Sequence, residues 1–238
     1  MRWLLFLFIL LQVGCATQYI LPTNRFMTPE SQGGMFNSQV EIQQTTGNQL
    51  TADLSQSSIH DGVTNGLISR TGYLFSTSIF DQIDLFWNHT GAANSMLGVK
   101  FQFLGSSRTG KGAGHKMALS AALGGNEHQI DGSTQVRYEL KGNEFQFLYG
   151  YRFNEIVLLY SNLSYSTYNF SGKVTSTDTT INGLRPKYES KIYAGHGGMQ
   201  LDMGAFFGKL ECGYQQLKTT NTKDVVNFTY GYSLGVSW

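Results

Sequence analysis

The sequence predicts an all-β fold, a transmembrane antiparallel up-and-down β-barrel of about ten strands, with eight to twelve compatible with the pattern. Three observations predict it. Segments in which apolar and polar residues alternate recur along the chain, as in strands with one apolar face. The chain is rich in glycine (28 residues), tyrosine (13) and phenylalanine (16), and only 14% of its residues are charged. After the leader, no apolar segment is long enough for a transmembrane helix, which excludes helix-bundle membrane folds.

The first residues have the pattern of a bacterial signal peptide. An apolar stretch from Trp3 to Val13 is interrupted only by Gln12. It is shorter than the roughly 20 residues of a spanning helix, so residues 1–14 are predicted to be a cleaved signal peptide. The segment Leu-Gln-Val-Gly-Cys that ends at Cys15 resembles the lipobox of bacterial lipoproteins, which implies lipidation of this cysteine. Gln12 departs from the lipobox pattern, and ordinary signal-peptidase cleavage nearby is the alternative.

Residues 15–34 contain two of the three prolines and show little periodicity. They are predicted to be a lipid-anchored irregular tether, and residues 35–238 the barrel. An even number of strands places both ends of the barrel on one side of the membrane, predicted to be the periplasmic side. The strands are predicted at residues 36–46, 67–80, 83–90, 95–104, 115–124, 143–153, 156–169, 188–199, 205–216 and 225–238. Residues 47–57 could add a strand, and Val136, Tyr138 and Leu140 are predicted to extend the sixth.

The connections between strands support this topology. Those at 80–83, 153–156 and 200–205 are short, as periplasmic turns are. Longer polar segments at 47–66, 125–142 and 170–187 are predicted to be external loops that could bind an extracellular ligand. Two connections disagree, because 91–94 is short where an external loop is expected and 105–114 is long where a periplasmic turn is expected.

The last strand alternates strictly and ends in an aromatic residue. Phe228 and every second residue after it are large and apolar, and most of the residues between them are small. This end resembles the C-terminal signal of Gram-negative outer-membrane β-barrel proteins. The resemblance implies an integral outer-membrane location, contact with outer-membrane lipids, and recognition by the barrel-assembly machinery. The lipobox resemblance at Cys15 implies recognition by the lipoprotein-sorting machinery. The predicted assembly signal comprises Tyr230, Tyr232, Leu234, Val236 and Trp238.

Polar residues on the opposite parity of the strands are predicted to face the barrel lumen. A charge on the lipid face would cost about 2 to 4 kcal/mol near the midplane, which favours this assignment. The main interpretation is a mostly filled lumen with a self-neutralising network, and the alternative is a narrow pore for small solutes. The predicted network comprises Arg70, Asp84, Lys100, Lys116, Glu144, Arg152, Lys209 and Glu211.

Other functions have weaker support. A rim-located hydrolase or lipid-modifying enzyme is a further alternative, because a nucleophile needs a base within hydrogen-bond reach. Its candidate histidines are His60 near Asp61, His89, and His128 near Glu127 and Asp131, whereas His196 has small neighbours and is predicted to be packed or luminal. No catalytic residue, metal site or cofactor is predicted. The net charge of +1 gives no case for nucleic acid.

Two further features carry no predicted activity. Residues 105–112 match a phosphate-binding P-loop except that Gly112 replaces the final Ser or Thr. Because the segment joins two alternating strands, it is interpreted as a flexible basic hairpin loop. Cys212 would be the only cysteine left after lipidation of Cys15, so no disulfide is expected. The sequence therefore predicts a small outer-membrane barrel that is a lipoprotein and has a structural or surface-interaction role.

Overall fold

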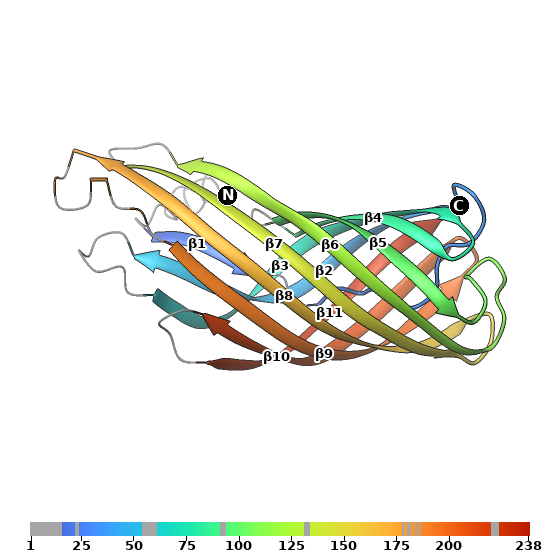
Figure 1. The fold of residues 1–238 in the computed structure, drawn as a ribbon. Coiled ribbons are helices and arrows are strands. Elements are labelled where there is room, and N and C mark those ends of the chain that lie inside the picture. Colours follow the sequence, from blue (N-terminus) through green and yellow to red (C-terminus); the bar gives the residue numbers. More distant parts are fainter. Residues whose placement is uncertain are drawn as a thin grey trace, which may run out of the picture.

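Ten antiparallel strands form a closed barrel in the computed structural model (Figure 1). The structure describes residues 16–21, 24–53, 61–90, 94–130, 134–177, 179, 182, 183, 185, 187–219 and 224–238. Consecutive strands from β2 to β11 pair with one another, and β2 also pairs with β11, which closes the sheet. The predicted fold class is confirmed. The strands are β1 (Ala16–Leu21), β2 (Ser38–Asp53), β3 (Asp61–Phe80), β4 (Ile83–Thr90), β5 (Asn94–Leu104), β6 (Gly114–Ile130), β7 (Thr134–Arg152), β8 (Val157–Ser176), β9 (Lys187–Met203), β10 (Phe206–Thr219) and β11 (Val225–Ser237).

The barrel has two distinct ends. At one end, here called the Trp238 end, the first residue of β2 meets the last residue of the chain, since Ser38 N donates to Trp238 O at 2.9 Å and Trp238 N donates to Ser38 O at 3.0 Å. The short connections after β3, β7 and β9 lie at this end, and so does the long connection 105–113. The opposite end is called the distal end. As predicted, both ends of the ten-stranded barrel lie on the same side.

Several strands continue beyond their predicted limits toward the distal end. β6 pairs with β7 through the register from Gly125–Lys141 to Ile130–Val136, and β7 pairs with β8 as far as Thr134–Ser176. Large parts of the predicted loops 47–66, 125–142 and 170–187 are therefore strand, and the loop assignment is wrong for those parts. The ladders continue because backbone pairing does not require an apolar face. The predicted extension of the sixth barrel strand is confirmed.

The two faces of the wall differ in polarity along each strand. Outward residues include Leu97, Leu123 and Leu234, which are 67%, 66% and 64% exposed. Inward residues alternate with them and are buried. In β8, whose alternation is ambiguous in the sequence, the even-numbered residues face inward, so apolar Leu158 and Tyr160 share the lumen with Asn162.

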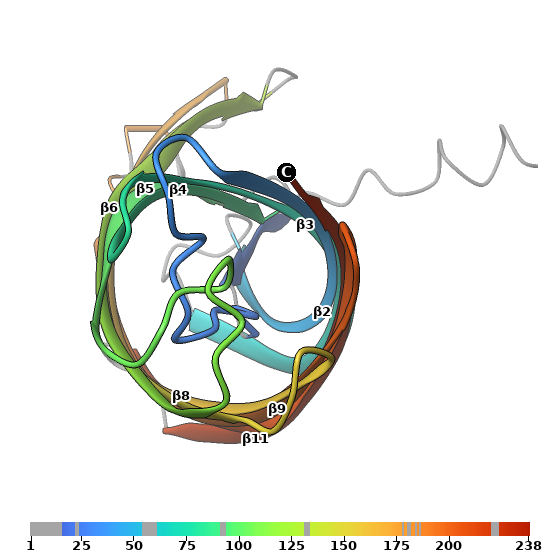
Figure 2. The same ribbon diagram turned by 90° about the vertical axis from the view of Figure 1, so that its right-hand side faces the viewer.

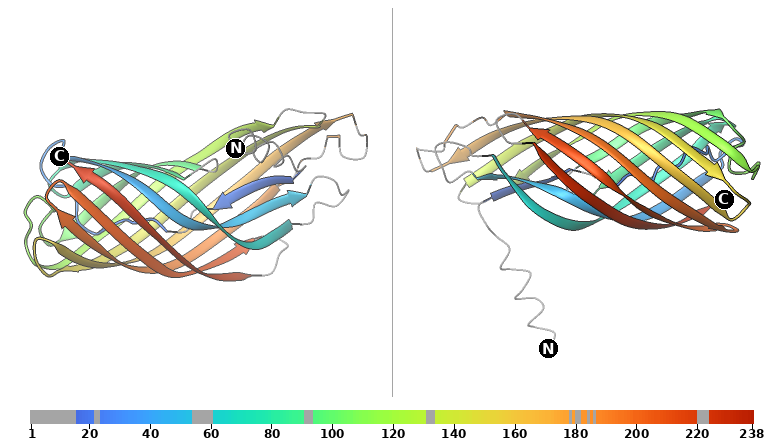
Figure 3. Two further views of the ribbon diagram at one scale, coloured as in Figure 1. Left: turned by 180° about the vertical axis from the view of Figure 1, so that it is seen from behind. Right: turned by 90° about the horizontal axis from the view of Figure 1, so that it is seen from below.

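The N-terminal segment lies differently from the predicted tether. β1 pairs antiparallel with the distal part of β2, with Leu21 opposite Asn48 and Ala16 opposite Asp53. Residues 24–34, here called the plug, then run through the lumen toward the Trp238 end, and 24–33 are buried (Figures 2 and 3). The tether prediction is therefore wrong for 16–21 and 24–34. The described start of the chain lies at the distal end rather than beside Trp238.

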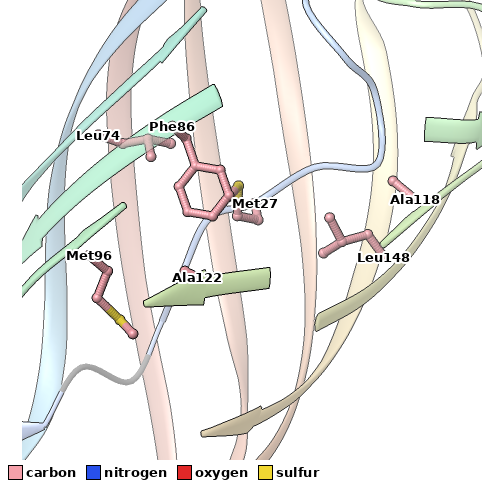
Figure 4. Packing of buried hydrophobic residues seen from close by; sticks show 7 residues of the cluster. All are labelled: Met27, Leu74, Phe86, Met96, Ala118, Ala122 and Leu148. Carbon is pink, nitrogen blue, oxygen red and sulfur yellow. The ribbon is translucent and has the colours of Figure 1, made fainter. Parts of the chain in front are cut away.

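The plug contributes to an apolar cluster inside the barrel (Figure 4). Met27 of the plug is 3% exposed and lies among inward-facing side chains from five strands. The plug thus has an apolar contact in addition to its polar ones. Burial of the Met27 side chain stabilises the fold by about 1.5 to 3 kcal/mol. The wall residues of the cluster are Leu74, Phe86, Met96, Ala118, Ala122 and Leu148.

Phe26 of the plug imposes a requirement on β11. Its φ is 53°, a left-handed conformation that is uncommon for a bulky residue, and its side chain is fully buried. A Cβ at Gly231 would lie 2.7 Å from Phe26 Cζ and 2.5 Å from the backbone oxygen of Gln44. Glycine at 231 therefore lets the plug approach the wall.

We expect Gly231→Ala to destabilise the folded barrel by about 1 to 3 kcal/mol, because the plug and β2 must both move. The measurement is the urea concentration at the midpoint of unfolding of the refolded protein. The shift of the folded band on an unheated gel monitors the unfolding. Gly197→Ala is the matched control, because a Cβ there meets its first neighbour at 4.0 Å. Equal midpoints for the two variants would contradict the close approach of Phe26.

Candidate functional site

The lumen is occupied by the plug, whose backbone is bonded to side chains of the barrel wall. The Glu211 carboxylate accepts from the backbone N–H groups of Arg25 at 3.0 Å and Phe26 at 3.1 Å. Farther along, Gln102 accepts from Ser31 N at 2.6 Å. A buried segment without regular secondary structure needs such partners, since unpaired buried backbone groups are costly.

Lysines of the wall bind carbonyl groups of the plug in the same way. Lys209 Nζ donates to Phe26 O at 2.7 Å, and Lys100 Nζ donates to Glu30 O at 2.5 Å. Both ammonium groups also face a carboxylate of the wall, Glu41 at 2.6 Å and Asp84 at 3.0 Å. Each lysine thus links the plug to a charge on the sheet.

The plug also contributes charges of its own. Glu30 accepts from Arg152 Nε at 2.6 Å and from Arg152 Nη2 at 2.5 Å, and Lys116 Nζ lies 3.6 Å from it. A bidentate arginine–carboxylate pair of this kind is among the stronger charge-assisted interactions. Arg152 also contacts Asp202 at 2.8 Å, so the network continues into β9.

Arg25 is the basic counterpart of Glu30 in the plug. Its Nε donates to Glu144 Oε2 at 2.6 Å, and Glu144 also accepts from Ser166 Oγ at 3.0 Å. The Glu144 carboxylate thus supplies the counter-charge that the Arg25 guanidinium needs inside the barrel. The guanidinium stays charged inside the barrel.

The buried charges of the lumen balance. Five basic and five acidic side chains are 3% exposed or less among the described residues. One basic and one acidic member come from the plug and the other eight from the wall. Breaking one buried pair leaves an uncompensated charge, whereas a complete network avoids that penalty. The ten are Arg25, Lys100, Lys116, Arg152 and Lys209, with Glu30, Glu41, Asp84, Glu144 and Glu211.

The connection 105–113 closes over the plug at the Trp238 end (Figure 2). Arg108 N donates to Ser31 O at 2.9 Å, and the Arg108 guanidinium contacts Asp202 at 2.5 Å and lies 4.3 Å from the ring centre of Phe207. Burial lowers the pKa of Arg108, and Asp202 and Glu30 partly offset this effect. The expected flexible hairpin loop is instead packed against the plug.

Seven of the eight predicted network residues lie buried in the lumen within this set of contacts. The eighth, Arg70, is half-buried opposite Thr45, and within the described part of the chain its guanidinium forms no salt bridge. Sequence reasoning missed Arg25, Glu30, Glu41 and Asp202. Glu41 and Asp202 share the inward parity of their strands, which could have identified them, whereas the plug has no period to reveal its two charges.

The described contacts of His196, His89 and His115 are to hydroxyl, amide and aromatic groups. His196 is luminal, with Nδ1 3.2 Å from Asn162 Oδ1 and Nε2 2.9 Å from Thr229 Oγ1. His89 faces outward, stacked on Trp87 with ring centres 5.6 Å apart, and its Nδ1 lies 2.8 Å from Ser95 Oγ. No carboxylate is bonded to any of these three rings in the described part of the chain. His60, Asp61's side chain, Asp131 and the side chain of His128 lie outside what is described.

Metal binding also has no support in the described ranges. No group of three or more His, Cys, Asp or Glu side chains there could hold a metal ion. Cys212 is a free cysteine exposed on the outer face of β10. Among the described residues there is no helix long and apolar enough to cross a membrane.

The outer face of the barrel changes character toward the distal end. Aromatic pairs lie between neighbouring strands, with ring centres 5.0 Å apart for Tyr165 and Tyr193 and 5.3 Å for Tyr214 and Phe228. Beyond these pairs, the outward side chains of β6 and β7 include Glu127, Arg137, Glu139 and Lys141, which form exposed ion pairs. A hollow of about 380 Å³ lies on β7 to β9 in this region, and its lining includes Glu139, Lys141, Asn169, Phe170, Ser171, Lys187 and Glu189.

The predicted assembly signal forms one outward row on β11. Its five side chains are 38% to 64% exposed, and Val236 pairs with Phe206 of β10 and with Val40 of β2. Cys15, the predicted lipidation site, lies outside the described residues.

Comparisons with known proteins give a distant structural likeness. The chain resembles two crystal structures of Ail, the attachment invasion locus protein of Yersinia pestis, one of them in complex with the heparin analogue sucrose octasulfate. Both are 14% identical to this chain and cover 86% of it and 100% of their own length, with TM-scores of 0.43 for the complex and 0.41 for the protein alone. No protein-family model and no curated protein matches. A likeness at this level assigns no function.

Removing the acidic charge of the plug tests the lumen network. We expect Glu30→Gln to lower the free energy of unfolding by roughly 3 to 5 kcal/mol, because Lys116 loses its buried counter-charge and Arg152 keeps only that of Asp202. Urea unfolding in detergent or lipid measures it. The control is Glu139→Gln, which removes the exposed partner of Lys141 at 2.8 Å and should change stability by less than about 1 kcal/mol. A loss for Glu30→Gln as small as that of the control would contradict a tightly coupled plug.

Proposed function

We propose that this protein is an outer-membrane lipoprotein whose barrel has a closed lumen and whose distal end acts at the cell surface, in a structural or interaction role. The observation that carries the proposal is the combination of an apolar outer wall with a lumen filled by the chain's own N-terminal segment. The first feature suits a membrane, and the second removes the space that a solute would need.

The membrane location is supported by the outward residues. Large apolar side chains such as Leu97, Phe145 and Leu163 are 59% to 67% exposed around the closed sheet. A soluble monomer rarely leaves so extended an apolar surface in water. In an outer-membrane barrel, the same residues form the band that contacts lipid, with aromatic residues near its edges. Lipidation of Cys15 rests on the lipobox-like sequence alone.

The closed lumen is supported by the contacts of the plug. Ten strands form a barrel only slightly wider than the eight-stranded barrels that side chains fill. Here the plug adds backbone and side chains to that space, and its charges are matched to the wall. A narrow pore would need a continuous wet path past Arg25, Met27 and Glu30, all of which are 3% exposed or less.

A role at the distal end is supported by the projecting strands. β6 to β9 extend beyond the aromatic residues and carry outward Glu139, Lys141, Lys187 and Glu189 around a hollow. We propose this region, together with the rest of residues 47–66, 125–142 and 170–187, as the surface that meets an extracellular ligand. Catalysis has no comparable support, since no His–carboxylate pair occurs among the described residues.

The closed lumen predicts that the folded protein does not conduct ions across a bilayer. Folded wild-type protein in a planar bilayer is expected to give no discrete conductance steps, because the plug and its ion pairs leave no water path. A variant lacking residues 24–33, shown to be folded by its shift on an unheated gel, is expected to conduct. Reproducible steps from wild-type protein would overturn the closed-lumen proposal and favour the narrow pore.

The C-terminal residue is expected to serve assembly. We expect Trp238→Ala to reduce the amount of folded barrel in the outer membrane several-fold, since recognition of the last strand depends on its aromatic end. Phe206→Ala is the matched control, because Phe206 is also an aromatic residue 64% exposed at the Trp238 end. Immunoblots of unheated and heated membranes measure both. Equal folded levels in the two variants would argue against a specific signal at Trp238.

A further inference from the structure

The plug has a direction that determines where the N-terminal end of the chain lies. Asn24 is at mid-height, where its side chain donates to Glu211 Oε1 at 3.3 Å and its backbone N–H donates to Thr45 Oγ1 at 3.3 Å. Ten residues later the plug has reached the Trp238 end, where Gly34 N donates to Asp81 Oδ1 at 2.7 Å. The chain therefore enters the lumen from the distal side and leaves it beside Trp238.

β1 continues the same path away from Trp238. The last residue of β2 that pairs with β11 is Thr45, and β1 pairs with β2 beyond that point, from Asn48 to Asp53. Because the pairing is antiparallel, Ala16 lies farther from the Trp238 end than Leu21. Two independent sets of contacts, those of the plug and those of β1, thus give the same direction.

The filled lumen prevents a return to the Trp238 end inside the barrel. Residues 24–33 are buried, and Arg25, Phe26 and Glu30 are at most 2% exposed, so a second pass of the chain has no space. From Asn24 back to Cys15 the chain has nine residues, which span at most about 30 Å when extended. To reach the Trp238 end, this part of the chain would have to follow the outside of the barrel.

We propose that the barrel exports its N-terminal segment, so that Ala16, at the start of β1, is displayed on the external side of the membrane. The proposal rests on the proposed outer-membrane location with the Trp238 end in the periplasm. It replaces the expectation of a lipid-anchored tether on the periplasmic side. The start of β1 thereby becomes accessible from outside the cell.

The experiment compares single cysteines in whole cells that produce the full chain with Cys212→Ser. Thr17→Cys tests β1, Thr179→Cys reports the distal end, and Gln82→Cys reports the turn at the Trp238 end. Each is treated with a membrane-impermeant maleimide before and after the outer membrane is permeabilised. The Cys212→Ser parent gives the background of unmodified Cys15.

The proposal expects Thr17→Cys and Thr179→Cys to be labelled in intact cells and Gln82→Cys to be labelled only after permeabilisation. A Thr17→Cys that stays at the parent's level in intact cells, beside a labelled Thr179→Cys, overturns the proposal and leaves the proposed membrane location intact. If Thr179→Cys is also unlabelled in intact cells, or if Gln82→Cys is labelled there, the proposed location or orientation is wrong instead.

A second measurement tests the path of the chain without a membrane. In purified folded protein with Cys212→Ser, Ile20→Cys with Gln49→Cys should form a disulfide on mild oxidation, because residues 20 and 49 are opposite each other in the β1–β2 ladder. The control pairs Ile20→Cys with Gln39→Cys, at the Trp238 end of β2. Cross-linking to position 49 and not to position 39 supports the path. Failure at position 49, or cross-linking at position 39, overturns it.

Discussion

The barrel depends on the neutralisation of charge in a space closed to water. The wall alone places four lysine or arginine side chains and four carboxylates in the lumen, and their pairing is completed by Arg25 and Glu30 of the plug. Burying these groups unpaired would cost several kcal/mol each. The plug in turn has no regular secondary structure, and it can be buried only because wall side chains accept and donate its backbone hydrogen bonds. Neither part satisfies its polar groups without the other.

This mutual dependence explains features on both faces of the sheet. On the outer face, large apolar side chains can lie next to one another in any arrangement, because lipid or detergent adapts to their shape. Inside, space is fixed, and glycine occurs where the plug comes closest, as Gly231 does beside Phe26. The apolar cluster around Met27 shows that the lumen is a mixed core, in which a few apolar contacts supplement the ion pairs. Each alternating strand therefore meets two different requirements. Its outward side chains can vary in shape, whereas its inward side chains must fit the plug.

The sequence predicted most of the barrel because period-two alternation is a local signal. The ten strands, their order, and the inward faces of Asp84, Lys100, Lys116 and Glu144 could be read from it. Strand lengths could not, since the distal parts of β6 to β9 are polar on the outer face and resemble loops. The plug was missed for a different reason. Its burial depends on partners far away in sequence, such as Glu211 for Arg25 N, and an irregular segment rich in polar residues has the same composition whether it is buried or solvated.

The position of the plug also constrains the order in which the molecule can be assembled. The segment is joined through residues 35–37 directly to β2, and β2 meets β11 only when the last strand has been added. At the Trp238 end, the connection 105–113 lies across the lumen and contacts Ser31. A finished barrel would leave the plug no route inward past this connection. The open sheet must therefore curl around its N-terminal segment, and seam closure between β2 and β11 becomes the step that traps it.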